Sequence, residues 1–578
     1  METVTLYAPQ PAPTLLSVSV AYSDVLEHPE RYYLGSDIVW MLISSALVFL
    51  MIPSLSLIYA GIGNRSFALT LFRLPLVTGA FVGLQWVFWG YALTFTRSIL
   101  PASWWGGESR AFALTDVLAR PIGEGDGVDG PSIPELVYVL YEGMFASFTA
   151  ALVCGGTMHR VRPARFLIFI SIWSLVVYDP VARWSWDPDG WSNKHGTMDF
   201  AGGTPVHIVS GTTVAAFAIF CSIERRNNFK DFVQAVKKFI KKLSKRIARP
   251  WVDIWRTLVM CVACCLGKQP EDPGSHSDEA EEEEEEEERG VPFEPYNLNY
   301  LVLGTALLWF GWAGFNGGSA LGGNLRAVSA WTSTHVAACT GGTVGILVIW
   351  YSKTFAWLNE ESRPEQAYDN LTVIYFCDGA IAGLVAITPA SGYVPVWSAA
   401  IFGATSALFV LWLKKQSSIL LREDPLQVFA VHAGGGFIGM LLTGLLASGT
   451  TIGLDGHSKM PHPEYTKGQR FGYQLLDASA GIGYTFFATL AILYFMKLVV
   501  YIFRHYFTSH HTGWWAATDF DDHYFLKDEF RATELQEWIR SSPTNDPRPS
   551  PLSQGSQPLS RQHLTPVQAS PGLVQPTP

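Results

Sequence analysis

Two apolar stretches of this chain each carry a histidine: Asp199-Phe-Ala-Gly-Gly-Thr-Pro-Val-His207 and, much later, Val428-Phe-Ala-Val-His432-Ala-Gly-Gly-Gly436. The clustered glycines allow another backbone to approach closely. An imidazole at membrane depth is costly and usually faces a cavity or a partner. One such histidine in each half of the chain suggests a pair that meets across a repeat interface. From these residues alone, two unrelated histidines, each hydrogen-bonded to a neighbouring helix, explain the pattern equally well.

The composition is that of a polytopic membrane protein. Of 578 residues, 49% are hydrophobic and only 16% are charged, and the apolar residues come in long blocks. Glu279 and Glu281–Glu288 supply nine negative charges, without which the formal net charge of −10 becomes −1. The cysteines show no spacing typical of a disulfide framework or a zinc site. We also find no nucleotide-binding loop and no nucleophile–base pair, so we expect no enzyme activity, no cofactor and no nucleic-acid partner.

Eleven segments have close to the roughly 20 apolar residues that a bilayer requires. They are predicted at residues 36–60, 68–95, 134–157, 164–183, 199–222, 297–321, 328–352, 371–391, 394–414, 426–449 and 472–503. The chain therefore divides into a polar lead, five spans, a cytoplasmic insertion, six spans and a tail, at 1–35, 36–224, 225–296, 297–503 and 504–578. Because eleven is odd, the termini lie on opposite sides of the membrane.

Basic residues predict the orientation. They follow spans one, three, five, seven and nine, as at Arg65 and Lys414, and Arg504 opens the tail. Basic residues in short loops mark the cytoplasmic side. We therefore expect an extracellular N-terminus, a cytoplasmic C-terminus and residence in the plasma membrane.

The insertion at 225–296 has parts of different character. Apolar residues recur at helical spacing over 229–247, and lysines fill the other face. Such a basic amphipathic helix suits anionic lipids of the inner leaflet. Packing against another part of the cytoplasmic face explains it equally well. The Glu281–Glu288 run and the Pro/Ser/Gln-rich tail are typical of disordered segments.

Several motifs occur together in one order. They are Gln85-Trp-Val-Phe-Trp-Gly-Tyr91, Gly143-Met-Phe-Ala146, Trp184-Ser-Trp-Asp-Pro-Asp-Gly-Trp191, Asp199-Phe-Ala-Gly-Gly-Thr-Pro-Val-His207, Gly311-Trp-Ala-Gly-Phe-Asn-Gly-Gly-Ser319 and the His432 stretch. In these motifs the chain resembles the ammonium transporters (the Amt, Mep and Rh group), most of all the fungal ammonium permeases. The resemblance runs from about residue 36 to 503, interrupted by the insertion.

The resemblance implies an all-α fold of eleven transmembrane helices, with two inverted five-helix repeats plus a final helix, in a homotrimer with one pore per subunit. It implies nitrogen uptake as ammonium or ammonia, and methylammonium as a further substrate. It also implies site residues: the pore twin-histidine pair His207 and His432, the outer ammonium recruitment site Phe145, Trp186 and Ser319, the phenylalanine gate Phe145 and Phe315, and Asp199 and Trp312 in pore-lining or structural roles.

The roles of some of these residues can also be argued from physical chemistry, independently of the family resemblance. A bare ammonium ion loses much hydration in an apolar pore, so it needs aromatic faces and an acceptor oxygen at the entrance. Trp186 can provide such a face, but an interfacial belt tryptophan is the alternative. Phe145 fits ordinary helix packing as well. Asp199 begins its span as an N-cap, which favours a structural role over one in shaping the vestibule field.

Some positions depart from the family pattern. Glu142 replaces a usual glutamine, Ala313 replaces a second aromatic residue, Gln427 replaces an acid, and His335 is an extra intramembrane histidine. These departures leave three hypotheses. The first is an ammonium transporter that recruits the cation and deprotonates it before conduction. The second is an ammonium sensor that signals through its cytoplasmic regions. The third is an electroneutral ammonia channel, against which the Trp186–Ser319 site argues.

Overall fold

The computed structural model describes residues 3–7, 17–65, 67–98, 104–122, 133–157, 163–226, 295–358, 365–421 and 424–507. All of them lie in one unit, residues 1–527. The predicted basic helix at 229–247, the acidic run and the tail from 508 lie outside the described residues.

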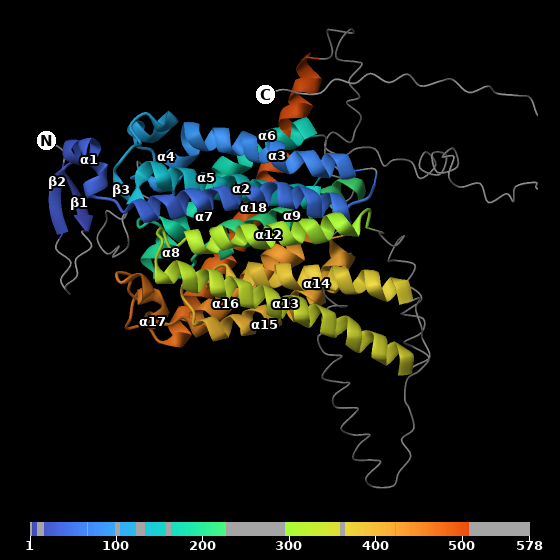
Figure 1. The fold of residues 1–578 in the computed structure, drawn as a ribbon. Coiled ribbons are helices and arrows are strands. Elements are labelled where there is room, and N and C mark those ends of the chain that lie inside the picture. The colour runs from blue at the N-terminus through green and yellow to red at the C-terminus, as the bar shows by residue number, and fades with distance from the viewer. Residues whose placement is uncertain are drawn as a thin grey trace, which may run out of the picture. The chain divides into compact units, whose positions relative to one another are not determined.

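Eleven helical segments in the described part of the chain are long and apolar enough to cross a membrane, which confirms the predicted fold class. They comprise α2 (Gly35–Ile62), α3–η2–α4 (Ala68–Gln85, Trp86–Gly90, Tyr91–Phe95), α5 (Glu135–Thr157), α6–η4–α7–α8 (Pro163–Trp173, Ser174–Tyr178, Asp179–Trp186, Trp191–Lys194), η5–α9 (Gly203–Ile208, Val209–Arg226), α12 (Leu298–Gly318), α13 (Leu325–Leu358), α14 (Glu365–Ile387), η6–α15 (Val396–Ser398, Ala399–Leu420), η7–α16 (Phe429–Gly434, Gly435–Leu446) and α18 (Lys467–Phe507). Figure 1 shows these helices bundled side by side.

Short elements gather at one end of the bundle, which we call the α17 end (Figure 1). They are the strands β1 (Thr3–Tyr7), β2 (Ser17–Ala21), β3 (Pro121–Ile122) and β4 (Ile133–Pro134) and the helices α1 (Tyr22–Glu27), η1 (Pro29–Arg31), η3 (Ser109–Leu114), α17 (Gly449–Ile452) and η8 (Gly453–Asp455). β1 pairs antiparallel with β2, and β3 with β4. The N-terminal lead thus contains a strand pair that the sequence analysis did not predict, although Ser17-Val-Ser-Val-Ala21 alternates polar and apolar residues.

Four π-helical turns lie in the spans of the described residues: η2 and η4 inside their spans, and η5 and η7 at the start of theirs. A π-turn inserts an extra residue into the helical ladder and re-aims the side chains around it, and such turns are frequent at functional sites. Two of the four, η5 and η7, carry the histidines singled out from the sequence.

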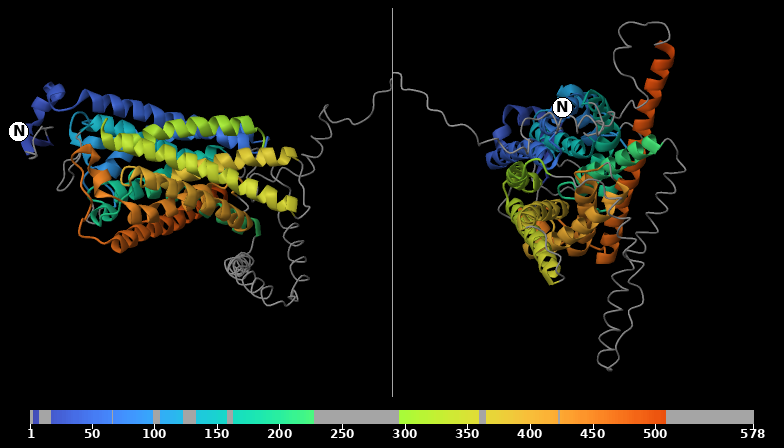
Figure 2. Two further views of the ribbon diagram at one scale, coloured as in Figure 1. Left: turned by 60° about the horizontal axis from the view of Figure 1, so that its bottom comes forward. Right: turned by 90° about the vertical axis from the view of Figure 1, so that its right-hand side faces the viewer.

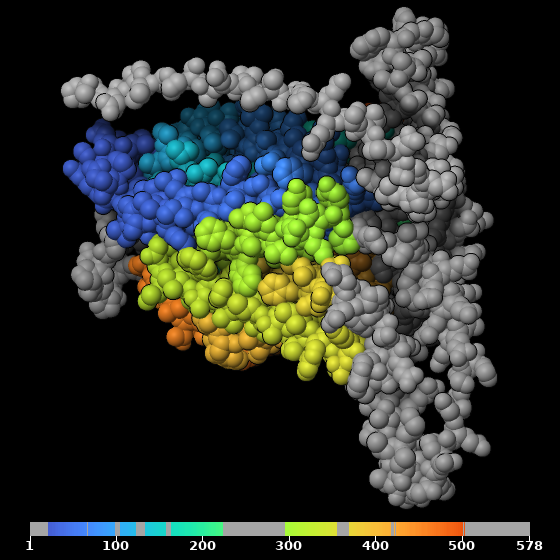
Figure 3. Space-filling model, turned by 45° about the vertical axis from the view of Figure 1, so that its right-hand side comes forward, coloured from blue at the N-terminus to red at the C-terminus, as the bar shows by residue number. Residues whose placement is uncertain are grey.

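The bundle has a buried middle and an apolar exterior. α5 and η5–α9 are the most enclosed spans, with 78% and 83% of their most apolar 18 residues buried. α2, α12 and α13 lie together on one face (Figure 3), and α13 runs beside α14 (Figure 2). These outer helices expose large apolar side chains, among them Phe49, Phe310, Leu347 and Trp350. An apolar surface of this extent suits lipid or a partner subunit rather than water.

Candidate functional site

Two phenylalanines from different helices stack inside the bundle. Phe145 of α5 and Phe315 of α12 have ring centroids 4.2 Å apart and planes inclined by 26°. Both are almost fully buried. Trp186, at the end of α7, meets the Phe145 ring edge-on at 5.8 Å. The structure therefore brings together three aromatic residues that the sequence analysis assigned to the gate and the outer site.

Ser319 lies directly beside this stack. It follows the last residue of α12, is half-buried, and donates its hydroxyl hydrogen to the Phe315 carbonyl oxygen at 3.0 Å. With that hydrogen engaged, its oxygen presents lone pairs as an acceptor. The Tyr141 hydroxyl lies 3.2 Å from Ser319 Oγ and hydrogen-bonds the Phe315 carbonyl at 2.7 Å. Tyr141 was not predicted from the sequence, although it lies one helical turn before Phe145 on the same face.

The two histidines meet in the interior. His207 Nδ1 lies 3.2 Å from His432 Nδ1, and their rings stack at 5.3 Å and 23°. Since one Nδ1 must donate and the other accept, the two imidazoles hold different tautomers when both are neutral. His207 Nε2 is buried with no hydrogen-bond partner in the described part of the chain. A buried polar atom in that state marks a place where a small polar guest can bind.

The rings form a continuous column. His207 stacks against Phe315 at 6.2 Å and against Trp312 at 5.5 Å, so the column runs from Phe145 through Phe315 and His207 to His432. Trp312 is fully buried, and its Nε1 donates to Thr388 Oγ1 at 2.9 Å. Trp312 is thereby held beside His207 by Thr388, the residue that follows α14.

An aspartate eight residues before each histidine binds the first amides of the histidine-bearing turn; Asp199 does so from outside the helix, whose N-cap residue is Gly202 and not Asp199 as predicted. Asp199 accepts backbone hydrogen bonds from Gly202, Gly203 and Thr204 at 2.9, 2.6 and 2.7 Å. Asp424 accepts from Val428 and Phe429 at 3.0 and 2.9 Å. These bonds satisfy amides that a helix start leaves unpaired. Asp199 was a predicted site residue but Asp424 was not, although its equal spacing from His432 was an available signal.

Glycines permit the close contact between the two halves, as expected from the sequence. A Cβ atom on Gly436 would lie 2.8 Å from the Gly203 carbonyl oxygen and 3.1 Å from the His207 Cβ. A Cβ on Gly211 would lie 2.4 Å from the Ala433 nitrogen. Any larger residue at these positions would separate η5 from η7, and with them the two imidazoles.

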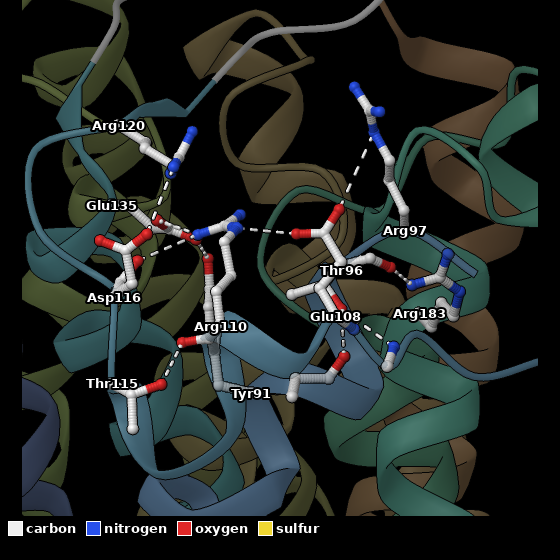
Figure 4. A network of polar contacts seen from close by, with 12 residues as sticks. Tyr91, Thr96, Arg97, Glu108, Arg110, Thr115, Asp116, Arg120, Glu135 and Arg183 are labelled. Atoms are coloured by element: carbon white, nitrogen blue, oxygen red, sulfur yellow. Dashed lines mark hydrogen bonds and ion pairs between the residues drawn. The ribbon is translucent and has the colours of Figure 1, made fainter. Parts of the chain in front are cut away.

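A polar network anchors the α17 end of this site, as Figure 4 shows. The fully buried Arg183 of α7 donates to the carbonyl oxygens of Thr94 and Thr96 at 2.8 and 2.7 Å. It thus ties the helix that carries Trp186 to the end of α4. Arg183 was not predicted from the sequence, although a basic residue inside an apolar span is a signal in itself.

A second part of the network lies between the loop at 104–122 and α5. Arg110 forms a 2.8 Å ion pair with the buried Glu135 and another with Glu108 (Figure 4). Burial alone would lower the pKa of Arg110, but the hydrogen bond and the negative charge of Glu135 outweigh it, so the pKa is raised. Arg110 therefore stays charged and fixes the start of α5, the helix that carries Phe145.

An arginine also organises the other half of the α17 end. Arg326 donates to the Gly392 carbonyl oxygen at 3.0 Å and pairs with Asp455 at 3.1 Å. Its guanidinium lies over the Phe200 ring at 5.0 Å. Burial acts to raise the pKa of Asp455, but hydrogen bonds from Ser458 and nearby amides, with the Arg326 charge, lower it overall. The cluster holds Phe200, the residue next to Asp199.

The departures from the family pattern fall in distinct places. Glu142 is buried one turn before Phe145, and its Oε2 has no hydrogen-bond partner among the described residues. Gln427 has a positive φ of 57° just before η7. Ala313 is buried in α12. His335 lies on the exposed face of α13, with its ring centroid 5.4 Å from that of Trp309 and the planes inclined by 42°, and it is not part of the histidine pair.

The fold and the site together define an eleven-helix membrane protein with an aromatic and imidazole column through its interior. Comparison with known proteins identifies its family: the model of the Ammonium Transporter Family matches residues 39–241 and 279–505, and the chain belongs to that family. It is 34% identical to ammonium transporter 1 of Schizosaccharomyces pombe, over 81% of this chain and 78% of that protein. It is 29% identical to the ammonium transporter MEP2 of Saccharomyces cerevisiae, over 80% and 78%.

The structural comparison agrees. The crystal structure of Candida albicans Mep2 superposes with a TM-score of 0.60 at 31% sequence identity, covering 81% of this chain and 86% of that one. The family match begins in α2 and ends in α18, so it includes every residue of the column.

Proposed function

We propose that this protein transports ammonium across a membrane, by recruiting the cation at Trp186, Phe145 and Ser319 and passing ammonia along the ring column to the twin histidines. The observation that supports this most directly is the imidazole pair beneath the stacked phenylalanines, with His207 Nε2 buried and unpartnered among the described residues. The names of the relatives, ammonium transporters, agree with it.

Recruitment follows from the groups at the α17 end of the column. An ammonium ion that loses water needs replacement contacts, because burying an unpaired charge is costly. The faces of Trp186 and Phe145 offer cation–π attraction, and Ser319 Oγ offers a lone pair. The stacked pair Phe145–Phe315 leaves no room for a hydrated ion, so its rings have to move aside for each passage.

Passage beyond the gate favours the neutral molecule, since the surroundings there are apolar and desolvation disfavours the charged form. Ammonia can then accept or donate a hydrogen bond at His207 Nε2. The released proton has its own route through the bonded imidazoles, each of which has one donor and one acceptor nitrogen. Recombination on the far side gives net movement of charge.

The proposal includes a location in the plasma membrane, assembly as a homotrimer and an orientation. The apolar outer face of α2, α12 and α13 suits a lipid bilayer and a homotrimer (Figure 3). With the N-terminus outside a plasma membrane, the α17 end faces the medium and collects ammonium from it.

The test is electrical and uses the full chain in liposomes. Ammonium pulses are expected to evoke a current in the wild type. The double variant His207→Ala/His432→Ala should lose this current or its selectivity for ammonium over potassium. His335→Ala removes an intramembrane imidazole outside the pair and is the matched control, with a current close to wild type.

Parallel recording of internal pH separates the alternatives. Alkalinisation by ammonia without any current from folded wild-type protein would contradict the proposed charge movement and favour an electroneutral ammonia channel. The absence of both signals, with ammonium binding retained, would favour a sensor. Equal currents with equal selectivity for ammonium over potassium in the wild type and the double histidine variant would refute a role of the pair.

A further inference from the structure

The last helix of the bundle, α18, contacts the segment that leads to His207. Four residues of α18 form the contact, and their spacing of three, four and seven places them on one helical face: Gln474, Asp477, Ala478 and Gly481. Their side of α18 faces residues 192–208.

Asp477 and Gln474 of α18 each form a pair of hydrogen bonds with this segment. Asp477 Oδ1 accepts from the Ser192 hydroxyl and Oδ2 from the Thr204 hydroxyl, both at 2.5 Å. Gln474 Oε1 accepts from the Met198 amide at 2.9 Å, and its Nε2 donates to the Met198 carbonyl oxygen at 2.7 Å. Asp477 and Gln474 are almost fully buried. A buried carboxylate is costly unless its hydrogen bonds are satisfied, so both hydroxyl donors matter.

Thr204 is consequently fixed from two elements. Its backbone amide is bonded to Asp199 and its side chain to Asp477. Gly481 leaves space for it, since a Cβ atom there would lie 2.6 Å from Thr204 Cγ2. Thr204 lies in η5, three residues before His207. A displacement of Thr204 therefore moves the π-turn that aims the His207 ring.

We propose that Asp477 is a positioning residue for conduction: it holds Thr204, and through η5 it keeps His207 Nδ1 within hydrogen-bond distance of His432 Nδ1. This inference rests on the proposed function of the histidine pair. The distance between the two nitrogens is already 3.2 Å. Because hydrogen bonds weaken steeply beyond that range, a shift of a few tenths of an ångström breaks the contact.

The experiment separates the hydroxyl of Thr204 from its shape. Thr204→Val keeps the shape and removes the donor, whereas Thr204→Ser keeps the donor. Asp477→Asn leaves one acceptor oxygen for two hydroxyls. We expect Thr204→Val and Asp477→Asn to lower the ammonium-evoked current about tenfold, within the range that an ångström-scale misplacement costs. Thr204→Ser should retain most of the current.

A second readout excludes general loss of structure. Ammonia-driven alkalinisation of the same liposomes should fall much less than the current, because the proton route alone depends on the paired nitrogens. Gly481→Ala, which presses on Thr204 without changing a polar group, should lower the same ratio of current to ammonia flux. Variants are compared only after size-exclusion chromatography shows folded protein.

Two results would overturn the inference. One is a wild-type ratio in folded Thr204→Val and Gly481→Ala, and the other is an equal fall of both fluxes. The double variant His207→Ala/His432→Ala is measured alongside. If it loses current while Thr204→Val does not, only the role of Asp477 fails. If it keeps both its current and its selectivity for ammonium, the proposed function fails first.

Discussion

His207 and His432 are separated by 225 residues, and their Nδ1 atoms lie 3.2 Å apart. Each ring follows an aspartate by eight residues and is placed by a π-helical turn. The same local arrangement therefore positions each histidine: Asp199 binds the amides of the first turn, and Asp424 binds those of the second. The geometry of the pair depends on both aspartates and on the glycines that let the turns approach.

Loss of the second aspartate should weaken both fold and pair. Asp424→Ala removes the acceptor for the Val428 and Phe429 amides. Losing a helix cap costs about 1 kcal/mol, and buried unsatisfied amides add to that. We expect a lower midpoint of thermal unfolding in detergent and a reduced ammonium current. Lys194→Met, which removes an exposed ion pair with Asp189, should leave the midpoint almost unchanged.

The ring face of Trp186 should contribute to substrate affinity. Cation–π contacts are worth about 1 kcal/mol. Trp186→Leu is expected to raise the half-saturating ammonium concentration roughly fivefold. Trp186→Phe also loses the Nε1 bond to the Asp199 carbonyl oxygen but keeps a ring, so its shift should be smaller. Identical shifts in the two variants would mean that the hydrogen bond, not the ring face, carries the effect.

Arg183 should be important for stability. Arg183→Met leaves the carbonyl oxygens of Thr94 and Thr96 without this donor and removes the positive charge beside Asp187. Breaking a buried charged contact by removing one partner costs about 3 kcal/mol or more. We expect a clear drop in the thermal midpoint, and a smaller drop for Arg183→Lys, which keeps the charge. A midpoint equal to wild type in Arg183→Met would contradict the anchoring role of Arg183.

Asp455 should make stability depend on acid pH. Its pKa in the folded protein is lowered by its hydrogen bonds and by Arg326, despite burial. A lowered carboxyl pKa stabilises the fold above the ordinary value of about 3.9, and this contribution is lost as the pH falls through the folded-state pKa. The thermal midpoint should therefore drop more steeply below about pH 4 in the wild type than in Asp455→Asn. Parallel curves for the two proteins would contradict this.

Much of the fold and several residues of the candidate site could be predicted from the sequence. Apolar blocks of span length predicted eleven membrane helices, because a bilayer demands about 20 apolar residues per crossing. The glycines around His207 and His432 predicted close approach, and the structure places Gly436 against Gly203. Family motifs brought Phe145, Phe315, Trp186 and Ser319 into one candidate site. The strand pair at the N-terminus was missed because its alternation extends over few residues.

Sequence by itself determined which segments cross the membrane and which residues carry polar chemistry inside it, since hydrophobicity and residue type are local properties. Only the tertiary structure decided that the imidazoles meet through Nδ1, that Tyr141 reaches Ser319, and that Asp477 holds Thr204. Each of these contacts joins helices far apart in the chain. Their distances follow from helix packing and side-chain direction, which no single stretch of sequence encodes.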